Sequence, residues 1–236
     1  VVNVEPAFPL DEQSSEDQRA ALLANQYFNN WFLDPIYKGS YPAEISEVYG
    51  NHLPDVHEED MAEIRIGPDL HALGVNYYLG KMVTHHPESP LLYEEVRRSG
   101  EMVNGLGWTV FLPPEYPPGL HRILHWLMEQ YGENGLKRIY VTENGFAGDS
   151  GPINEDGAHE DPERLHYIQQ HLVQAADAVR DGIPLEAWFA WTLMDNYEWA
   201  EGYRPESRFG MVHVDRETME RRPKTSALWY GDLMRA

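Results

Sequence analysis

Two glutamates follow apolar runs of the sequence, at points where an extended segment gives way to a loop. Glu143 ends such a run in RIYVTENG (residues 138–145), where strand formers precede it and a strong Asn-Gly turn signal follows it. Glu198 follows the run IPLEAWFAWTLMDN (residues 183–196). A strand-end glutamate is suited to be the nucleophile of a retaining glycosidase, which also needs a protonated carboxyl group about 5–5.5 Å away. From the local pattern alone, a turn or capping role explains Glu143 equally well, and a helix-entry role explains Glu198.

Polar and aromatic residues gather at the ends of the other apolar runs as well. The polar and tyrosine residues at the four run ends are Asn3, Glu5, Asn76, Tyr77, Tyr78, Glu143, Asn144, Asp195, Asn196 and Glu198. Aromatic residues are concentrated between residues 188 and 203, at Trp188, Trp191, Tyr197, Trp199 and Tyr203. A carboxylate accepts hydrogen bonds from sugar hydroxyls, and a tryptophan face stacks on a pyranose ring. Helix capping does not explain the aromatic residues, so the combination favours a carbohydrate site.

The apolar runs predict the strands that would position these residues. Each run is apolar throughout rather than alternating, which is typical of strands buried on both faces of a parallel sheet. We predict strands at residues 1–4, 70–79, 138–143 and 183–196. Helical periodicity predicts helices at residues 14–33, 41–50, 57–67, 117–132, 161–182 and 224–236, and residues 208–224 have the pattern of a hairpin. Residues 80–116 have no strong period, and we predict a long loop.

The alternation of strands and helices indicates an α/β protein with a parallel sheet. A (β/α)8 barrel needs eight strands and typically about 250 residues, whereas only four predicted strands fit into this chain of 236 residues. An open four-stranded sheet would leave two parallel edges and an apolar face exposed. We therefore expect half of a barrel, completed by another chain or by a missing N-terminal segment.

The composition excludes several classes of partner. The net charge is −21, from 39 acidic and 18 basic residues, which argues against nucleic acid and anionic membranes because both need a basic surface. No apolar run approaches the length of about 18 residues that a membrane helix needs, and no signal peptide is visible. The absence of cysteine excludes disulfides and thiolate chemistry. We favour a cytoplasmic over a secreted protein, although the composition decides neither.

A pair of histidines, His121 and His125, lies four residues apart on the helix predicted at residues 117–132. This spacing would suit a metal site, but the glutamate of an H-E-x-x-H pattern is missing. We interpret the pair as part of a solvated or half-buried helix face. We expect neither a metal nor a cofactor.

Longer motifs resemble those of glycoside hydrolase family 1, the β-glucosidase family. They are LGVNYY (73–78), YVTENG (140–145) and WTLMDNYEWAEGY with RFGMVHVD (191–215), together with NNWFLDPIYKGSYP (29–42), GWTV (107–110) and RRPKTSALWY (221–230). The similarity covers almost the whole chain, and the motifs follow the order of the family. It implies that residues 1–236 form a single unit, the C-terminal half (strands five to eight) of a (β/α)8 TIM barrel.

The resemblance also implies an activity, that of a retaining β-glycosidase of the β-glucosidase type, and a role for residues at the reacting centre. Glu143 would be the catalytic nucleophile that forms the glycosyl-enzyme. Tyr78 would donate a hydrogen bond that holds this carboxylate ionised and oriented. Asn76 would line the same site.

The other residues that the resemblance implies would bind the substrate, a β-glucoside or cello-oligosaccharide. Trp191 would form the platform under the glycone ring, while Glu198 and Trp199 would bind hydroxyls far from the anomeric centre. Trp108 would shape the leaving-group side, and Phe209 would lie near the exocyclic carbon of the sugar. Because a carboxylate at Glu198 would repel a phosphate dianion, we expect a non-phosphorylated glycone.

The T-F-N-E-P stretch that carries the acid/base glutamate of the family is absent from the chain. A nucleophile without this partner does not run a double displacement at useful speed on poor leaving groups. We therefore expect the N-terminal half of the same enzyme, bearing that glutamate, as a partner. Two other hypotheses stay open: a carbohydrate-binding half-barrel without catalysis, and a structural interaction protein whose strand-end polar residues are only caps.

Overall fold

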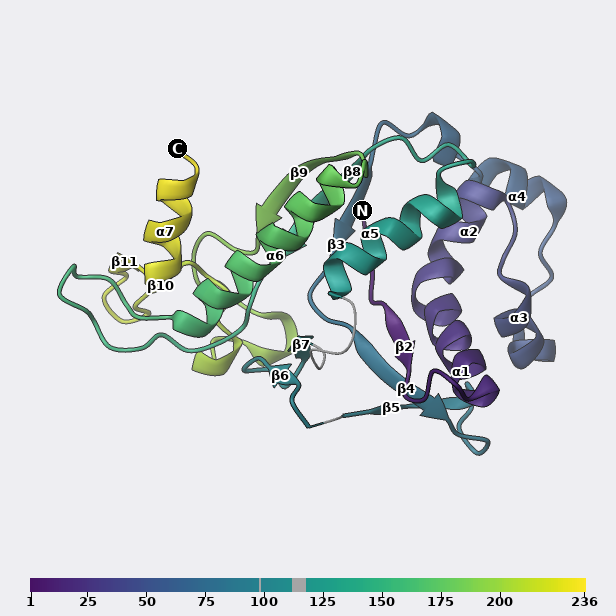
Figure 1. Ribbon diagram of the computed structural model, residues 1–236, viewed down its shortest axis with the longest axis horizontal. Coiled ribbons are helices and arrows are strands. Elements are labelled where there is room, and N and C mark those ends of the chain that lie inside the picture. The colour runs from purple at the N-terminus through teal and green to yellow at the C-terminus, as the bar shows by residue number, and fades with distance from the viewer. Residues whose placement is uncertain (98, 112–117) are drawn as a thin grey trace.

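A sheet of parallel strands forms the centre of the computed structural model, which describes residues 1–97, 99–111 and 118–236 (Figure 1). Within these residues, the four strands of the sheet are β1 (Val2–Asn3), β3 (Leu73–Asn76), β8 (Ile139–Asn144) and β9 (Leu185–Ala190). Their order in the sheet is their order in the chain, and all neighbouring pairs are parallel. Consecutive strands are neighbours in the same way in a (β/α)8 barrel. The four predicted strands are confirmed; β1, β3 and β9 are shorter than predicted, and β8 has the predicted length with its bounds one residue later.

Two helices that connect these strands cover the sheet. Helix α5 (Gly119–Tyr131) leads from β3 to β8, and α6 (Pro162–Arg180) leads from β8 to β9. The apolar residues of α5 that pack on the sheet follow the spacing of one helix face: Leu120, Ile123, Leu124 and Leu127. They share a buried cluster with Val75 of β3 and Val141 of β8. Both predicted helices are confirmed, except that Pro117 lies outside the described residues.

The helix predicted at residues 14–33 extends further than predicted. It comprises α1 (Ser15–Asn25), a π-helical turn (Gln26–Asn30) and α2 (Trp31–Lys38), and it ends where Gly39 adopts a left-handed conformation with φ of 74°. Although Pro35 removes a hydrogen bond inside α2, Leu33 and Tyr37 are fully buried, and their packing outweighs that loss. The next two predicted helices are confirmed as α3 (Ala43–Tyr49) and α4 (Glu58–Ile64). Among the described residues, no helix is both long and apolar enough to cross a bilayer.

The prediction of a loop over residues 80–116 is wrong for the part that the structure describes. Strand β4 (Lys81–His85) pairs antiparallel with β5 (Tyr93–Val96), and β6 (Met102–Val103) pairs antiparallel with β7 (Thr109–Phe111). Strand β4 also pairs in parallel with β2 (Ala7–Pro9), which follows β1. These strands are short and partly polar, so their pairing depends on non-local main-chain hydrogen bonds that leave no period in the sequence. Residues 98 and 112–116, which belong to the predicted loop, lie outside the described residues.

The C-terminal segment ends in a helix that packs beside α6. The predicted hairpin is confirmed as β10 (Val212–Val214) and β11 (Arg221–Pro223), and the predicted last helix as α7 (Thr225–Leu233). In the described part of the four-stranded sheet, β1 and β9 each have one neighbour. Phe189 of β9 is 54% exposed, so this strand is not buried on both faces as its sequence predicts.

A buried histidine, His171, lies in the middle of α6 among aromatic rings. Its ring stacks on Tyr167 with centroids 3.8 Å apart, and the rings of Phe111 and Tyr77 lie 5.2 and 5.7 Å away. Its Nδ1 lies 2.8 Å from the Tyr167 carbonyl oxygen, one helical turn earlier. Burial disfavours the charged imidazolium and lowers the pKa of His171 to about 4.

The depressed pKa of His171 predicts a loss of stability in mild acid. Between pH 6.5 and pH 4 the unfolded chain binds a proton at this residue that the folded chain does not, so the free energy of unfolding falls as the pH falls through this window. Across this pH window, the full decrease in the free energy of unfolding is about 3 kcal/mol. We expect His171→Gln to flatten the pH dependence of the urea midpoint between pH 7 and pH 4.5. His52→Gln, at an exposed position outside this helix, is the control; an unchanged pH dependence in His171→Gln would contradict the prediction.

Candidate active site

A cavity of about 810 Å³ opens at the carboxyl ends of the parallel strands. All of the residues predicted to form a site line it: Asn76, Tyr78, Trp108, Glu143, Trp191, Glu198, Trp199 and Phe209. They come from segments far apart in the chain and meet because the carboxyl ends of parallel strands share one edge of the sheet. A register shift between β3 and β8 sets Asn76 opposite Glu143. The structure therefore brings the predicted residues together in one place.

The carboxylate of Glu143 is held by a single tyrosine. The Tyr78 hydroxyl donates a hydrogen bond of 2.7 Å to Glu143 Oε2. Burial, and then the neighbouring Glu143 carboxylate, raise the pKa of Tyr78 well above its usual range, so this hydroxyl stays protonated and remains a donor. Glu143 is therefore oriented as a hydrogen-bond acceptor at the end of β8.

Aromatic side chains fix the Tyr78 ring. Trp108 and Phe209 meet it edge-on, with ring centroids 5.8 and 5.6 Å away, and they lie 6.0 Å from each other. Such edge-to-face contacts between rings are favourable beyond the area that they bury. The position of the Tyr78 hydroxyl, and with it that of Glu143, depends on these two side chains.

Three further residues position the site, and none of them was assigned a role from the sequence. Thr142 donates a hydrogen bond of 2.8 Å to Asn76 Oδ1, which orients the amide of Asn76. Buried Asn144 donates to the Tyr77 carbonyl oxygen at 2.7 Å and to the Tyr167 hydroxyl at 2.8 Å. The Tyr167 hydroxyl in turn donates to the Tyr78 carbonyl oxygen at 3.0 Å. Asn144 stands out in the sequence as a polar strand end, but Tyr167 carries no signal, because aromatic residues are common on buried helix faces.

Gly145 allows the ends of β8 and β9 to approach each other. A Cβ atom on Gly145 would lie 1.9 Å from the carbonyl oxygen of Trp191. The Trp191 amide donates to the Asn144 carbonyl oxygen at 2.9 Å, and the peptide bond between Trp191 and Thr192 is cis. The glycine of the T-E-N-G motif is thus required by a close contact with the segment that carries Trp191.

Among the residues that the structure describes, four carboxylates line the cavity, in two different settings. Glu5 and Glu95 both pair with Lys81, with Nζ–Oε distances of 2.8 and 2.7 Å. Glu143 and Glu198 form the second set: burial, and then the negative charge of Glu143, raise the pKa of Glu198. A carboxyl group in a cleft whose pKa is raised by burial and by a neighbouring carboxylate is a frequent feature of functional sites.

The loop after β9 presents Glu198 and Trp199 at the mouth of the cavity. Trp199 begins a 3-10 turn (Trp199–Glu201), and the Glu198 amide donates to the Gly202 carbonyl oxygen at 2.8 Å. Trp199 is 85% exposed, so the described residues leave this large aromatic side chain almost uncovered. An uncovered tryptophan beside a carboxylate is suited to contact a sugar that enters the cavity.

Comparison with known proteins identifies relatives of the whole chain. The sequence model of glycosyl hydrolase family 1 matches residues 1–236. The 1,4-beta-D-glucan glucohydrolase of Thermotoga neapolitana is 39% identical over 94% of this chain and 47% of its own length. A beta-glucosidase of Agrobacterium sp. is 39% identical over 99% of this chain and 48% of its own length.

Comparison with solved structures also finds beta-glucosidases. The beta-glucosidase from Thermotoga maritima in complex with deoxynojirimycin superposes with a TM-score of 0.87 and 36% identity, covering 99% of this chain and 49% of that one. The chain thus spans about half the length of the relatives that it matches. Because these neighbours are TIM-barrel enzymes, the predicted fold class, half of a (β/α)8 barrel, is confirmed.

The tight contact at Gly145 predicts that even a methyl group is not tolerated there. Gly145→Ala forces the β8 end or the Trp191 segment to move, because the obstructing atom is a backbone oxygen. We expect a loss of about 1–3 kcal/mol in the free energy of unfolding, measured by urea denaturation. The control is Gly231→Ala in α7, where a Cβ atom meets only the end of the Arg235 side chain at 3.6 Å. Equal stability of the two variants would contradict the prediction.

Proposed function

The chain belongs to glycosyl hydrolase family 1, and from that premise we propose that it carries the nucleophile of a retaining β-glucosidase. The reaction would be the hydrolysis of terminal, non-phosphorylated β-D-glucosyl residues by double displacement. The observation that carries the proposal is Glu143 at the end of β8, held by the Tyr78 hydroxyl at 2.7 Å inside a cavity lined with tryptophans. A carboxylate so oriented is what the first displacement requires.

In the first step, an oxygen of the Glu143 carboxylate attacks the anomeric carbon, and the bond from that carbon to the leaving oxygen breaks. The leaving oxygen takes a proton from a second carboxyl group. In the second step, that group removes a proton from a water molecule, which attacks the glycosyl-enzyme and releases Glu143. Tyr78, which remains a donor, keeps Glu143 in line with the anomeric carbon through both steps.

The second carboxyl group would come from polypeptide outside this chain, the N-terminal half of the same enzyme. Of the other carboxylates at the cavity within the described residues, Glu5 and Glu95 are paired with Lys81. The remaining one, Glu198, lies at the cavity mouth on the loop that bears Trp199, a place suited to hydroxyl binding. The relatives that the chain matches are twice its length, which is consistent with a contribution from a further segment.

The glycone would bind between the aromatic and the carboxylate groups of the cavity. Trp191 would lie under the sugar ring, with Glu198 and Trp199 at the hydroxyls remote from the anomeric carbon. Asn76, whose amide is oriented by Thr142, would donate to a hydroxyl near Glu143. Because Glu198 would repel a phosphate dianion, the fitting substrates are neutral β-glucosides and cello-oligosaccharides.

The leaving group would lie on the opposite side of Glu143 from these residues. Trp108 would shape that side of the cavity, and Phe209 would pack near the exocyclic carbon of the glycone. Both rings contact Tyr78 edge-on, so the leaving-group side at Trp108 and the glycone position at Phe209 are each connected to the nucleophile.

Removal of the nucleophile tests the proposal directly. We expect Glu143→Gln to lower kcat for an aryl β-glucoside by at least about a thousandfold, because an amide does not form the glycosyl-enzyme. The measurement uses the active, assembled protein. The control is Glu155→Gln at an exposed loop position, which should keep full activity. Unaffected hydrolysis in Glu143→Gln would end the nucleophile assignment, and sugar binding without hydrolysis in the parent protein would favour a carbohydrate-binding half-barrel instead.

The role of Glu198 is tested by comparing leaving groups. As a ligand of the glycone, Glu198 should matter equally for phenyl and dinitrophenyl β-glucosides, and Glu198→Gln should lower kcat/KM for both by about 10- to 100-fold through the loss of charge-assisted hydrogen bonds. An acid/base residue would behave differently, because a dinitrophenolate leaves without protonation. A loss confined to the phenyl substrate would therefore assign the acid/base role to Glu198 and contradict our placement of that group outside this chain.

A further inference from the structure

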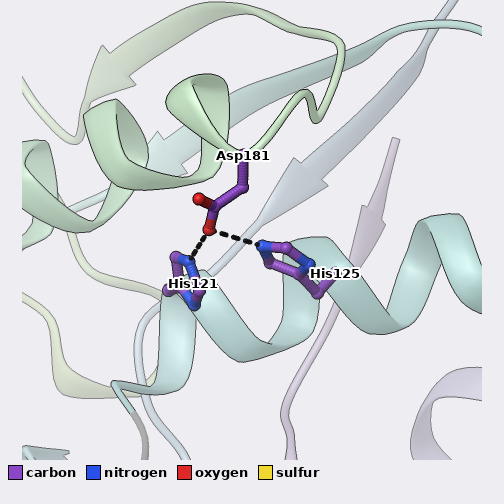
Figure 2. Close-up of side chains that lie close together, drawn as sticks. All are labelled: His121, His125 and Asp181. Atoms are coloured by element: carbon purple, nitrogen blue, oxygen red, sulfur yellow. Dashed lines mark hydrogen bonds and ion pairs between the residues drawn. The ribbon is translucent and has the colours of Figure 1, made fainter.

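A second cluster of reactive side chains lies away from the cavity, between α5 and α6 (Figure 2). His121 and His125 are one turn apart on α5, and both turn their Nε2 atoms to the same oxygen of Asp181 at the end of α6. The Nε2–Oδ2 distances are 2.8 Å for His121 and 3.2 Å for His125. Among the described residues, this is the only group of three His, Cys, Asp or Glu side chains with ligand atoms within 4.8 Å of one another.

The backbone around this cluster is held in place. Gln174 of α6 accepts hydrogen bonds from the amides of Leu120 and His121 through its Oε1, at 3.0 and 3.4 Å, and so joins the start of α5 to α6. Leu124 of α5 and Ala178 of α6 are fully buried in the same core cluster. The side chains of the two histidines and Asp181 are 29%, 28% and 47% exposed. The cluster is therefore preorganised, yet open to an ion from solvent.

The geometry and the donor types fit a tetrahedral metal ion. Bonds of 2.0–2.2 Å from Zn²⁺ to imidazole nitrogen and carboxylate oxygen set neighbouring ligand atoms about 3.4 Å apart. From 2.8 and 3.2 Å, the two Nε2–Oδ2 distances would widen by about 0.6 and about 0.2 Å to reach this value. Two imidazoles and one carboxylate would leave the fourth position to water, as in many zinc sites with three protein ligands.

The surrounding charge also favours a cation at this place. Asp181 is the C-cap of α6, where the free carbonyl groups of the helix end carry partial negative charge. The preceding Arg180 pairs with Asp177 at 2.6 Å and so leaves Asp181 to the histidines. A simple hydrogen-bonded pair would need only one imidazole, whereas here two converge on one oxygen.

We propose that His121, His125 and Asp181 form a binding site for a divalent transition metal, with Zn²⁺ as the fitting ion. Each imidazole would keep its proton on Nδ1 and direct the Nε2 lone pair to the metal. None of the three residues lines the cavity at the strand ends, so the site is independent of the proposed glycosidase chemistry. The metal would tie the helix before β8 to the helix after it and stabilise the packing of α5 on α6.

Metal titration tests this site. Zn²⁺ is titrated by calorimetry into the assembled protein after chelator treatment, and Co²⁺ is added in parallel to record its visible absorption. We expect one equivalent of Zn²⁺, a higher Tm with Zn²⁺ than with chelator, and the intense Co²⁺ bands of a tetrahedral site. Absence of stoichiometric Zn²⁺ binding would overturn the proposal.

Variants of the three residues distinguish this site from adventitious binding. We expect His125→Ala and Asp181→Asn each to weaken Zn²⁺ binding by at least about tenfold and to abolish the rise in Tm. We expect weaker Zn²⁺ binding in His121→Gln as well, which replaces the imidazole with an amide side chain of similar length. His52→Ala, at an exposed position outside the cluster, should bind like the parent protein. If affinity is unchanged in the cluster variants, or falls equally in His52→Ala, the proposed site is wrong.

Discussion

The side-chain amide of Asn144 joins three parts of the molecule that must meet for the cavity to exist. It lies at the end of β8, fully buried, and donates both to the backbone that follows β3 and to the Tyr167 hydroxyl on α6. Because Tyr167 then donates to the Tyr78 carbonyl oxygen, two adjacent residues after β3 are held from one point. A buried polar group that lost these partners would cost more than an ordinary hydrogen bond contributes. The position of Tyr78, and therefore the orientation of Glu143, follows from this small network.

Two buried cations hold the segments around the cavity in a comparable way. Arg164 of α6 is almost fully buried and donates to the carbonyl oxygens of Phe146, Gly148 and Arg208, besides its ion pair with Asp161 at 2.8 Å. It thus joins the loop after T-E-N-G to the residue before Phe209. Lys224 is fully buried against Asp195 at 2.9 Å, and burial lowers its pKa to about 8. Since an unpaired buried charge is strongly destabilising, these pairs fix the loops in one arrangement.

The sequence predicted the strands and the cavity-lining residues but not what holds them. Strands such as Ile139–Asn144 have a local signature, because burial on both faces demands apolar side chains. Arg164 and Tyr167 have none, because their partners are backbone carbonyls and hydroxyls that only the fold brings near. The same reason explains why the sequence did not predict strands β4 to β7, whose pairing partners lie elsewhere in the chain. His121 and His125 do lie on a half-buried face of α5, as the sequence predicts, but their shared partner Asp181 follows them by 60 and 56 residues, so no helical spacing connects the three.

The repulsion between two carboxylates in the cavity sets a requirement for the segment that would complete the barrel under the proposed function. Glu143 and Glu198 face the same space, and the charge of Glu143 adds to burial in raising the pKa of Glu198. Under the proposed function, closing a barrel over them would remove water and strengthen this repulsion. Donors or cations that the closing segment brings to the cavity would offset it and favour the carboxylate form of Glu198, which accepts hydroxyl hydrogen bonds. Under the proposed function, the part of the enzyme that supplies the acid/base group would then also supply the groups that keep the glycone site of this chain ionised. Glycone binding and catalysis would in this way both depend on the joining of the two halves.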